Sequence, residues 1–394
     1  MAVENGAGAD DGDEGARPTR PSADEAEPAG TDGPEQEGSR SRRARLRALA
    51  SHRRGRALLA TTAAAVLIAA GLTTTWATGT WPFPGNDRYC WGAWQENSGP
   101  DFLADEAEEY GERTSAQSAP APGHPRGTCT VAVGGDGDDT GTTVKVTYGP
   151  APGDTAKRLE WIVDHVGGDA VPVPDGLPGM VAARSGLLVL PERCDTADGR
   201  PTAVTLDAET GGAGLGGDRS VAALLVAAAN HGMEAAGCAG ERPLEVTSPV
   251  LTLPARDDTY PDRGCRMPGL EFDDSVSRLV ESHVGTVSDD LQSCAVRTGS
   301  DDSRFYDMLM VARPRLAALL DGTTGTKPAA RGWRGTGVFG DGYKVVRAQC
   351  GKRPATFLML GTTGEESKRF AVFTDAVTRR LGCAPVAPHG GERV

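Results

Sequence analysis

The sequence predicts an α+β protein with two tandem homologous domains, each an antiparallel sheet with helices on one side, disulfide-stapled, and preceded by one transmembrane helix. Three observations predict this arrangement. Residues 57–78 form a run of 22 residues without charge, all eight cysteines follow that run, and a pattern of four cysteines with matching neighbours occurs twice. Hairpins of strands followed by helices favour an antiparallel sheet.

Residues 1–39 predict a disordered acidic tail. They hold eleven acidic side chains against two arginines, and large hydrophobic residues are nearly absent. Such a segment buries too little apolar surface to offset the entropy lost on ordering. We interpret the tail as a solvated cytoplasmic spacer.

The charge changes sign in residues 40–56, where eight arginines from Arg40 to Arg56 precede the uncharged run. Positive charge beside a membrane helix stays cytoplasmic, and it attracts anionic lipid headgroups. We expect no nucleic-acid partner, because the whole chain carries a formal net charge of −13 and phosphate binding requires a basic surface.

Residues 57–78 predict a membrane crossing. At a helical rise of about 1.5 Å per residue the run spans about 33 Å, which exceeds a hydrocarbon core of about 30 Å. Two alternatives stay open: a signal peptide cleaved near residues 75–77, and a twin-arginine signal built on the pairs at 42–43 or 53–54. No cysteine borders the run, which excludes a lipoprotein anchor. We therefore expect a single-pass cell-membrane protein with its N-terminus in the cytoplasm and its C-terminus outside.

The cysteines predict disulfides in an oxidising compartment, because an even number lies on one side of the predicted membrane. Their neighbours recur in order. Asp-Arg-Tyr-Cys90 is followed later by Asp-Arg-Gly-Cys265, and Gly-Cys238-Ala by Gly-Cys383-Ala. This self-similarity predicts a duplication, with repeats at 87–240 and 262–386 joined by a linker at 241–261.

Each repeat is predicted to run helix, strand, strand, helix, strand, strand, helix. The final helices end at a Gly-Cys pair, and glycine is a frequent helix stop. The helix at 273–284 depends on apolar residues at helical spacing, including Val280 and His283. The predicted helices are 101–110, 155–166, 220–236, 273–284, 315–320 and 366–381, and the predicted strands are 129–133, 144–148, 187–192, 203–206, 294–297, 308–311, 343–348 and 356–360.

Four cysteines allow three pairings in each repeat. We favour pairing the first with the second and the third with the fourth. Closing loops of roughly thirty to forty residues stabilises by about 3–4 kcal/mol per bridge in the chain-entropy account. The favoured bridges are Cys90–Cys129, Cys194–Cys238, Cys265–Cys294 and Cys350–Cys383.

One family resemblance follows from the order Cys90, a short helix from Asp101, Cys129-Thr-Val, a Gly/Asp turn and Val144-Lys-Val-Thr-Tyr. This order resembles a domain of unknown function in secreted and lipid-anchored actinobacterial envelope proteins. The second repeat resembles it from Cys265 to Pro314. The resemblance covers most of each repeat and implies an envelope location and this fold. It supplies no catalytic residues, and the chain departs from the family by having a predicted spanning helix.

No motif predicts an enzyme, a cofactor or a metal site. The glycine-rich run 211–217 lacks the Lys-Ser/Thr ending of a phosphate-binding loop. Residues 136–147 begin like a calcium loop but end on Thr147, where a bidentate glutamate is required. The six histidines show no ligand spacing.

The aromatic cluster Tyr89, Trp91 and Trp94 is the candidate binding feature in a chain with only 5% aromatic residues. Aromatic side chains are enriched at binding hot spots. The cluster adjoins Cys90, however, so packing over a disulfide is the favoured interpretation.

These observations favour a non-enzymatic, membrane-anchored envelope protein that binds a ligand, a wall component or a partner protein through its outer domains. A cleft between duplicated domains is a frequent place for a pocket. The alternative is a structural or assembly adaptor that acts through the cytoplasmic tail. A hydrolase with an unrecognised site is the third hypothesis.

Overall fold

The computed structural model describes residues 87–104, 113–134, 141–210, 214–251, 264–272, 279–299, 303–361 and 366–388. The predicted tail, arginine-rich segment and membrane crossing lie outside these residues. Within the described ranges, no helix combines the length and the apolar character that a membrane crossing requires. Residues 85–394 form one compact unit, and we call its described parts the N-terminal half (87–251) and the C-terminal half (264–388).

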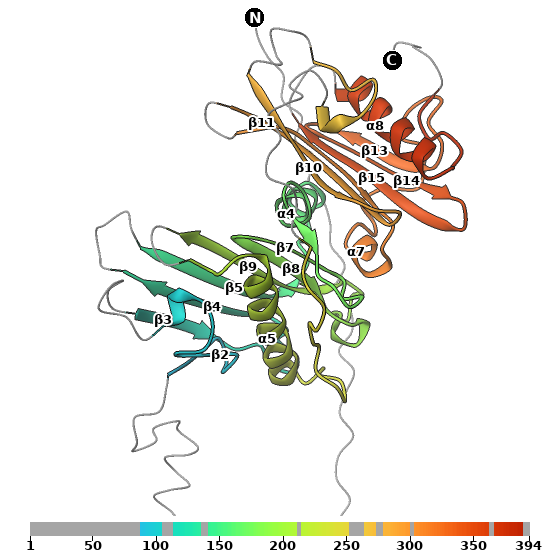
Figure 1. Cartoon of the computed structure of the whole chain (residues 1–394). Helices are drawn as coiled ribbons and strands as arrows, with labels where there is room; N and C mark the ends of the chain where they lie inside the picture. The colour runs from blue at the N-terminus through green and yellow to red at the C-terminus, as the bar shows by residue number, and fades with distance from the viewer. Residues whose placement is uncertain are drawn as a thin grey trace, which may run out of the picture. The chain divides into compact units, whose positions relative to one another are not determined.

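The described chain is α+β with antiparallel sheets, as predicted (Figure 1). The N-terminal half carries a seven-stranded sheet and a short hairpin, and the C-terminal half a six-stranded sheet. The N-terminal strands are β1 Arg88–Tyr89, β2 Trp94–Gln95, β3 Arg113–Ser118, β4 Gly127–Val133, β5 Thr142–Pro150, β6 Val171–Pro172, β7 Gly179–Ala182, β8 Ser185–Val189 and β9 Thr202–Thr210. The C-terminal strands are β10 Val280–Val287, β11 Leu291–Thr298, β12 Arg304–Val311, β13 Thr336–Gly340, β14 Tyr343–Cys350 and β15 Arg353–Gly361.

The two sheets share one strand order. The first runs β3-β4-β5-β9-β8-β7-β6, and the second runs β10-β11-β12-β15-β14-β13. In each sheet, a first three-stranded meander joins a second one through a central antiparallel pair, β5–β9 or β12–β15, and the first sheet adds the short strand β6 at its edge. A helix follows the first meander and another follows the second, in both halves. The helices are α4 Thr155–Val166, α5 Asp218–Ala236, α7 Pro314–Ala318 and α8 Glu366–Arg380.

The prediction that helices lie on one side of each sheet is wrong. In β8, Leu188 joins the core that contains α5, whereas Leu187 and Val189 join a core that contains α4. In β15, Phe357 packs with α8 while Leu358 packs with α4. The central strands are apolar on both faces, and alternate side chains of a strand point to opposite faces. Each sheet therefore needs cover on both sides.

The predicted helix at 273–284 is also wrong where the chain is described. Residues 280–287 form strand β10, which pairs with β11 from Val280↔Thr298 to Val287↔Gln292. Pairing is regular from Val280 to Val284, so Val280 and His283 lie on opposite faces of the strand, and both are buried because β10 is covered on both sides. Of the predicted helix at 101–110, a single 3-10 turn at Asp101–Leu103 is described.

The four predicted disulfides are confirmed, and the described chain holds no free cysteine. Each pair has a Cα separation typical of disulfides. The pairs are Cys90–Cys129, Cys194–Cys238, Cys265–Cys294 and Cys350–Cys383, with Cα atoms 5.1, 5.3, 5.7 and 5.1 Å apart.

The cysteine neighbourhoods also match in backbone conformation. Cys90 and Cys265 both have φ of 51°, and each is followed by a second residue in the left-handed region, which is costly for non-glycine residues. The C-terminal ends of α5 and α8 match too. Gly237 (φ 72°) and Gly382 (φ 66°) are left-handed, and the N–H of the next cysteine bonds back to the carbonyl five residues earlier.

A candidate ligand groove at the seam between the halves

The two halves share an apolar core, which we call the seam. One face of α4, with Leu159, Ile162 and Val163, packs together with Leu309 of β12 and Leu358 of β15. Asp154 starts α4 by accepting a hydrogen bond from the Lys157 N–H at 2.9 Å. Burying side chains of this size stabilises by about 1.5–3 kcal/mol each, so the seam makes the halves mutually dependent.

Polar contacts fix the position of the seam. The Arg315 guanidinium, at the start of α7, donates to both carboxylate oxygens of Asp195, at 2.7 and 3.0 Å, and to the Leu190 carbonyl oxygen. Arg304 of β12 pairs with Asp164 of α4. Bidentate arginine–carboxylate pairs add geometric specificity as well as energy. These contacts therefore favour one relative placement of the two halves.

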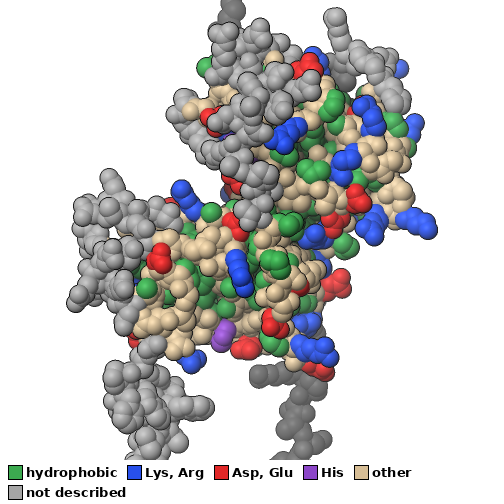
Figure 2. Space-filling model, viewed as in Figure 1, with side chains coloured by type: hydrophobic (Ala, Val, Ile, Leu, Met, Phe, Trp, Pro, Cys, Tyr) green, Lys and Arg blue, Asp and Glu red, His purple; other side chains and the backbone are tan. Residues whose placement is uncertain are grey.

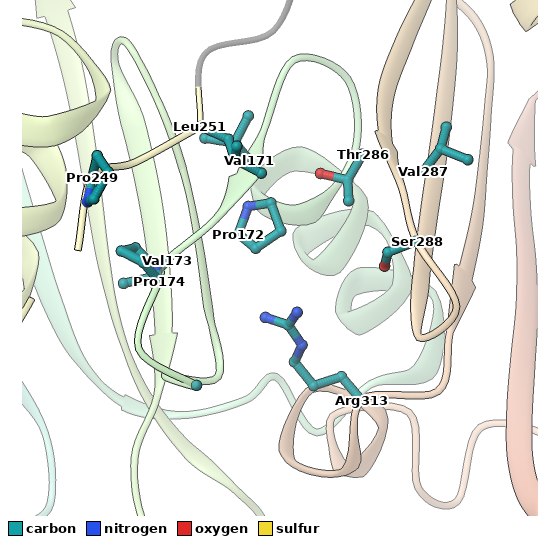
Figure 3. Close-up of a pocket in the computed structure, with 11 residues that line it drawn as sticks. Val171, Pro172, Val173, Pro174, Pro249, Leu251, Thr286, Val287, Ser288 and Arg313 are labelled. Atoms are coloured by element: carbon teal, nitrogen blue, oxygen red, sulfur yellow. The ribbon is translucent and has the colours of Figure 1, made fainter.

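A groove opens at one end of the seam (Figure 3). Its volume is about 460 Å³, within the range of small-molecule sites. It is lined by β6 and the loop after it, by the end of β10, by the start of α7 and by the segment that leads out of the N-terminal half. The lining residues are Val171, Pro172, Val173, Pro174, Gly176, Pro249, Leu251, Thr286, Val287, Ser288 and Arg313.

One carboxylate holds the linker against the groove. Asp175, in the left-handed region at φ 59°, accepts hydrogen bonds from the backbone N–H and the hydroxyl of both Thr247 and Ser248. The hydrogen bonds from Ser248, and then those from Thr247, lower the pKa of Asp175 to about 2. The ionised carboxylate therefore places Pro249 and Leu251 at the rim.

The carboxylate of Asp290 positions Arg313, which supplies the positive charge of the groove. Asp290 accepts from Arg313 Nε at 3.1 Å and from the Ser288 hydroxyl at 2.7 Å. Partial burial raises the pKa of Asp290, but the Ser288 and Arg313 contacts outweigh burial and the net pKa lies below the ordinary value. In Figure 3 the guanidinium points toward Pro172.

The groove exposes apolar surface. Leu251 is 68% exposed and Val287 50% exposed, and the only other large hydrophobic side chain as exposed among the described residues is Leu279 at 65%. On the face shown in Figure 2, acidic and basic side chains are interspersed over the described surface. Two of the three most exposed apolar side chains thus border one pocket, which is typical of a binding surface.

A second pocket at the seam, of about 270 Å³, is polar. His283 Nδ1 of β10 lies 3.1 Å from Asp169 Oδ1 of the N-terminal half, and Arg297 Nη1 donates to Asp307 at 2.8 Å. The His283 side chain is only 4% exposed, and its Nε2 atom is buried without a hydrogen-bond partner among the described residues. The pocket's charges pair with one another, so we interpret it as part of the seam.

The predicted aromatic cluster lies in the core of the N-terminal half. Tyr89 and Trp94 are buried against the Cys90–Cys129 disulfide, and Trp94 Nε1 donates to the Leu224 carbonyl at 3.0 Å. Trp91 is partly buried, and its ring meets Tyr148 edge to face. Burial leaves Tyr89 and Trp94 no surface for a ligand, which agrees with the packing interpretation.

No protein-family model, curated protein or solved structure matches the chain significantly. Within the described ranges, no three His, Cys, Asp or Glu side chains gather in a way that could hold a metal ion. The start of the calcium-loop-like stretch, at 136–140, lies outside the described residues.

Sequence reasoning missed the groove residues. Val287 and Arg313 lie in one half, and Pro172 and Asp175 in the other, more than 100 residues away. The one available signal was the Pro-containing segment 241–261, which we predicted only as a linker between the repeats. Its last described residues, Pro249 and Leu251, form part of the groove wall.

Proposed function

We propose that this protein is a membrane-anchored envelope protein that binds an extracytoplasmic ligand in the groove at the seam. One observation carries the proposal: both halves line a single apolar groove, the N-terminal half through β6 and through its last described residues, and Leu251 and Val287 are exposed at it. Residues 171–176, 249–251 and 286–313 each supply only part of the lining, so the groove exists only in the folded chain.

The anchor and the topology belong to the same proposal. Residues 57–78 cross the membrane once, the arginines at 40–56 stay on the cytoplasmic side beside anionic lipid headgroups, and residues 87–394 lie outside. The disulfides support this orientation, because they persist in oxidising compartments. A membrane-impermeant protease added to intact cells should degrade the part that carries the cysteines and leave the tail intact.

We also propose that the halves are homologous domains that arose by duplication. Their common strand order, the left-handed pairs at Cys90 and Cys265, and the matching helix ends before Cys238 and Cys383 support this origin. The likeness to a domain of actinobacterial envelope proteins remains part of the proposal, and it rests on the cysteine and strand order.

The proposed role is binding rather than catalysis. A catalytic His–carboxylate pair needs its second ring nitrogen to reach a substrate, whereas His283 Nε2 is buried. The carboxylates of the polar pocket face arginine or histidine partners. This favours a structural use of that pocket and leaves the apolar groove as the ligand site.

The test is in-cell cross-linking and purification of the full chain with groove variants. Leu251→Arg and Val287→Arg place a bulky charge at the groove, and we expect each to lose a captured envelope component. Leu279→Arg is the matched control, because Leu279 is equally exposed and lies outside the groove. Equal capture by all three variants would contradict the proposal. Capture that depends only on residues 1–56 would support the adaptor alternative instead.

A further inference from the structure

The polar groups of the groove define what it can bind. The Thr286 hydroxyl donates to the Ala170 carbonyl at 3.2 Å, and the Ser288 hydroxyl donates to Asp290 at 2.7 Å. Arg313 uses its Nε for Asp290. Among the described side chains that line the groove, the remaining donors are therefore Nη1 and Nη2 of Arg313.

The walls of the groove disfavour a peptide. Pro172, Pro174 and Pro249 line it, and proline has no N–H to offer. A bound peptide would bring N–H and C=O groups beside walls whose described side chains offer only the Arg313 Nη donors, and each buried unsatisfied group costs about 1–3 kcal/mol. An aliphatic chain carries no such groups, so the walls favour an aliphatic ligand.

Arg313 favours one type of polar group on that ligand. The two Nη atoms of a guanidinium form a planar pair of donors that matches a carboxylate in bidentate geometry. The Arg313 side chain is 21% exposed, and it points into the groove in Figure 3. Because Asp290 occupies only Nε, the outer edge of the guanidinium stays available.

We propose that the groove binds an apolar carboxylate. Its aliphatic chain packs against Pro172, Pro249 and Val287, and its carboxylate accepts hydrogen bonds from Nη1 and Nη2 of Arg313. This inference rests on the proposed function, because it names the ligand class of the same groove.

The experiment uses the full chain in lipid nanodiscs and two photoreactive probes, a diazirine-bearing decanoic acid and the matching decanol. Mass spectrometry after irradiation locates the label, so that probe dissolved in the lipid is distinguished from probe in the groove. We expect labelling of residues 171–176 and 249–251 at an acid concentration at least about tenfold below that of the alcohol, as for a hydrogen bond to a charged group.

Two matched pairs of variants test the carboxylate contact. Arg313→Gln should remove the preference for the acid, and Arg242→Gln, at an exposed arginine outside the groove, should keep it. Leu251→Glu should weaken labelling by the acid and leave the alcohol unchanged, relative to Leu251→Gln. The second pair remains informative if Arg313→Gln disturbs folding, because Leu251 is exposed.

The outcomes separate the two proposals. Equal labelling of the groove by acid and alcohol, unchanged in Arg313→Gln and Leu251→Glu, would overturn the carboxylate inference and leave the groove as an apolar ligand site. If neither probe labels the groove although Leu251→Arg abolishes capture of an envelope component, the ligand class is wrong and the proposed function stands. If neither probe labels the groove and capture is also unaffected, both fail.

Discussion

At the scale of single residues, Asp307 is a buried carboxylate, and its charge is costly to bury unless it is paired. It is 1% exposed and accepts from Arg297 at 2.8 Å and from Arg304 at 2.6 Å. Burial raises its pKa above the ordinary value even though both arginines oppose the shift. Removing one partner of a buried pair leaves an uncompensated charge.

We therefore expect Asp307→Asn to lower the free energy of unfolding by about 1–3 kcal/mol, because Arg297 and Arg304 lose a buried acceptor but stay partly exposed. Asp321→Asn is the control in the same half, because its 57% exposed carboxylate meets Arg347 at the surface and such pairs contribute about 0–1 kcal/mol. Denaturant unfolding measures both variants. Similar losses would show that Asp307 has no special role.

His165 makes a second residue-scale contribution, one that depends on pH. Burial lowers its pKa, but the hydrogen bond and charge of Asp207, 3.1 Å from Nε2, outweigh burial and the net pKa lies above 6.5. The folded state therefore holds this proton more tightly than the unfolded state, and the resulting stability is present below pH 6.5 and lost as pH rises through the folded pKa.

Accordingly, His165→Gln should flatten the fall in melting temperature as the pH rises above 6.5, measured by calorimetry. His231→Gln is the comparison, because that ring is 38% exposed and 3.7 Å from Glu234. A wild-type melting temperature that does not fall over this range would refute the role of His165.

At the scale of elements, strand β10 meets the N-terminal half closely. A Cβ on Gly285 would overlap the Gly168 carbonyl oxygen and Ser293 Oγ. The sequence indicates no such contact, because Gly168 and Gly285 become neighbours only when the halves associate.

Gly285→Ala should thus lower the free energy of unfolding by about 1–3 kcal/mol, the usual cost of overpacking. Hydrogen exchange should accelerate first in β10 and in residues 167–170. Gly153→Ala is the control, because its added Cβ would make an ordinary contact 3.7 Å from Arg200 Nη1. Unchanged exchange in both segments would show that the seam tolerates the methyl group.

At the scale of the whole molecule, the shared core couples the halves. One face of α4 packs in a single core with side chains of β8 in the N-terminal half and of β12 and β15 in the C-terminal half. Separating the halves would expose them to water. Unfolding one half removes the cover of the other, so we expect cooperative behaviour.

Calorimetry of the disulfide-bonded full chain should therefore show one unfolding transition for residues 87–388. Leu358→Ala, in the seam, should shift that whole transition, with a cost of about 2–5 kcal/mol for a large-to-small core change. Two separate transitions, of which Leu358→Ala moves one, would contradict the coupling.

The sequence by itself determined the class and the covalent frame of this protein. The α+β class followed from strand and helix periodicity, and the repeated cysteine neighbours predicted two sets of four cysteines; the sequence favoured one of three pairings in each set, and the structure has that pairing. Helix α4 was predicted with its observed bounds, since Leu159, Ile162 and Val163 mark one apolar face.

Only the tertiary structure decided which faces are covered and where a ligand site lies. Strand β3 is polar, and β7 and β13 are short and contain glycine. None of the three shows the apolar–polar alternation that predicts a strand, so the neighbouring strands decide how they pair. The groove joins Pro172, Leu251, Val287 and Arg313, which are distant in sequence. Periodicity tells which side of an element is apolar, but it does not tell which surface will cover that side, because that choice is made by packing between distant segments.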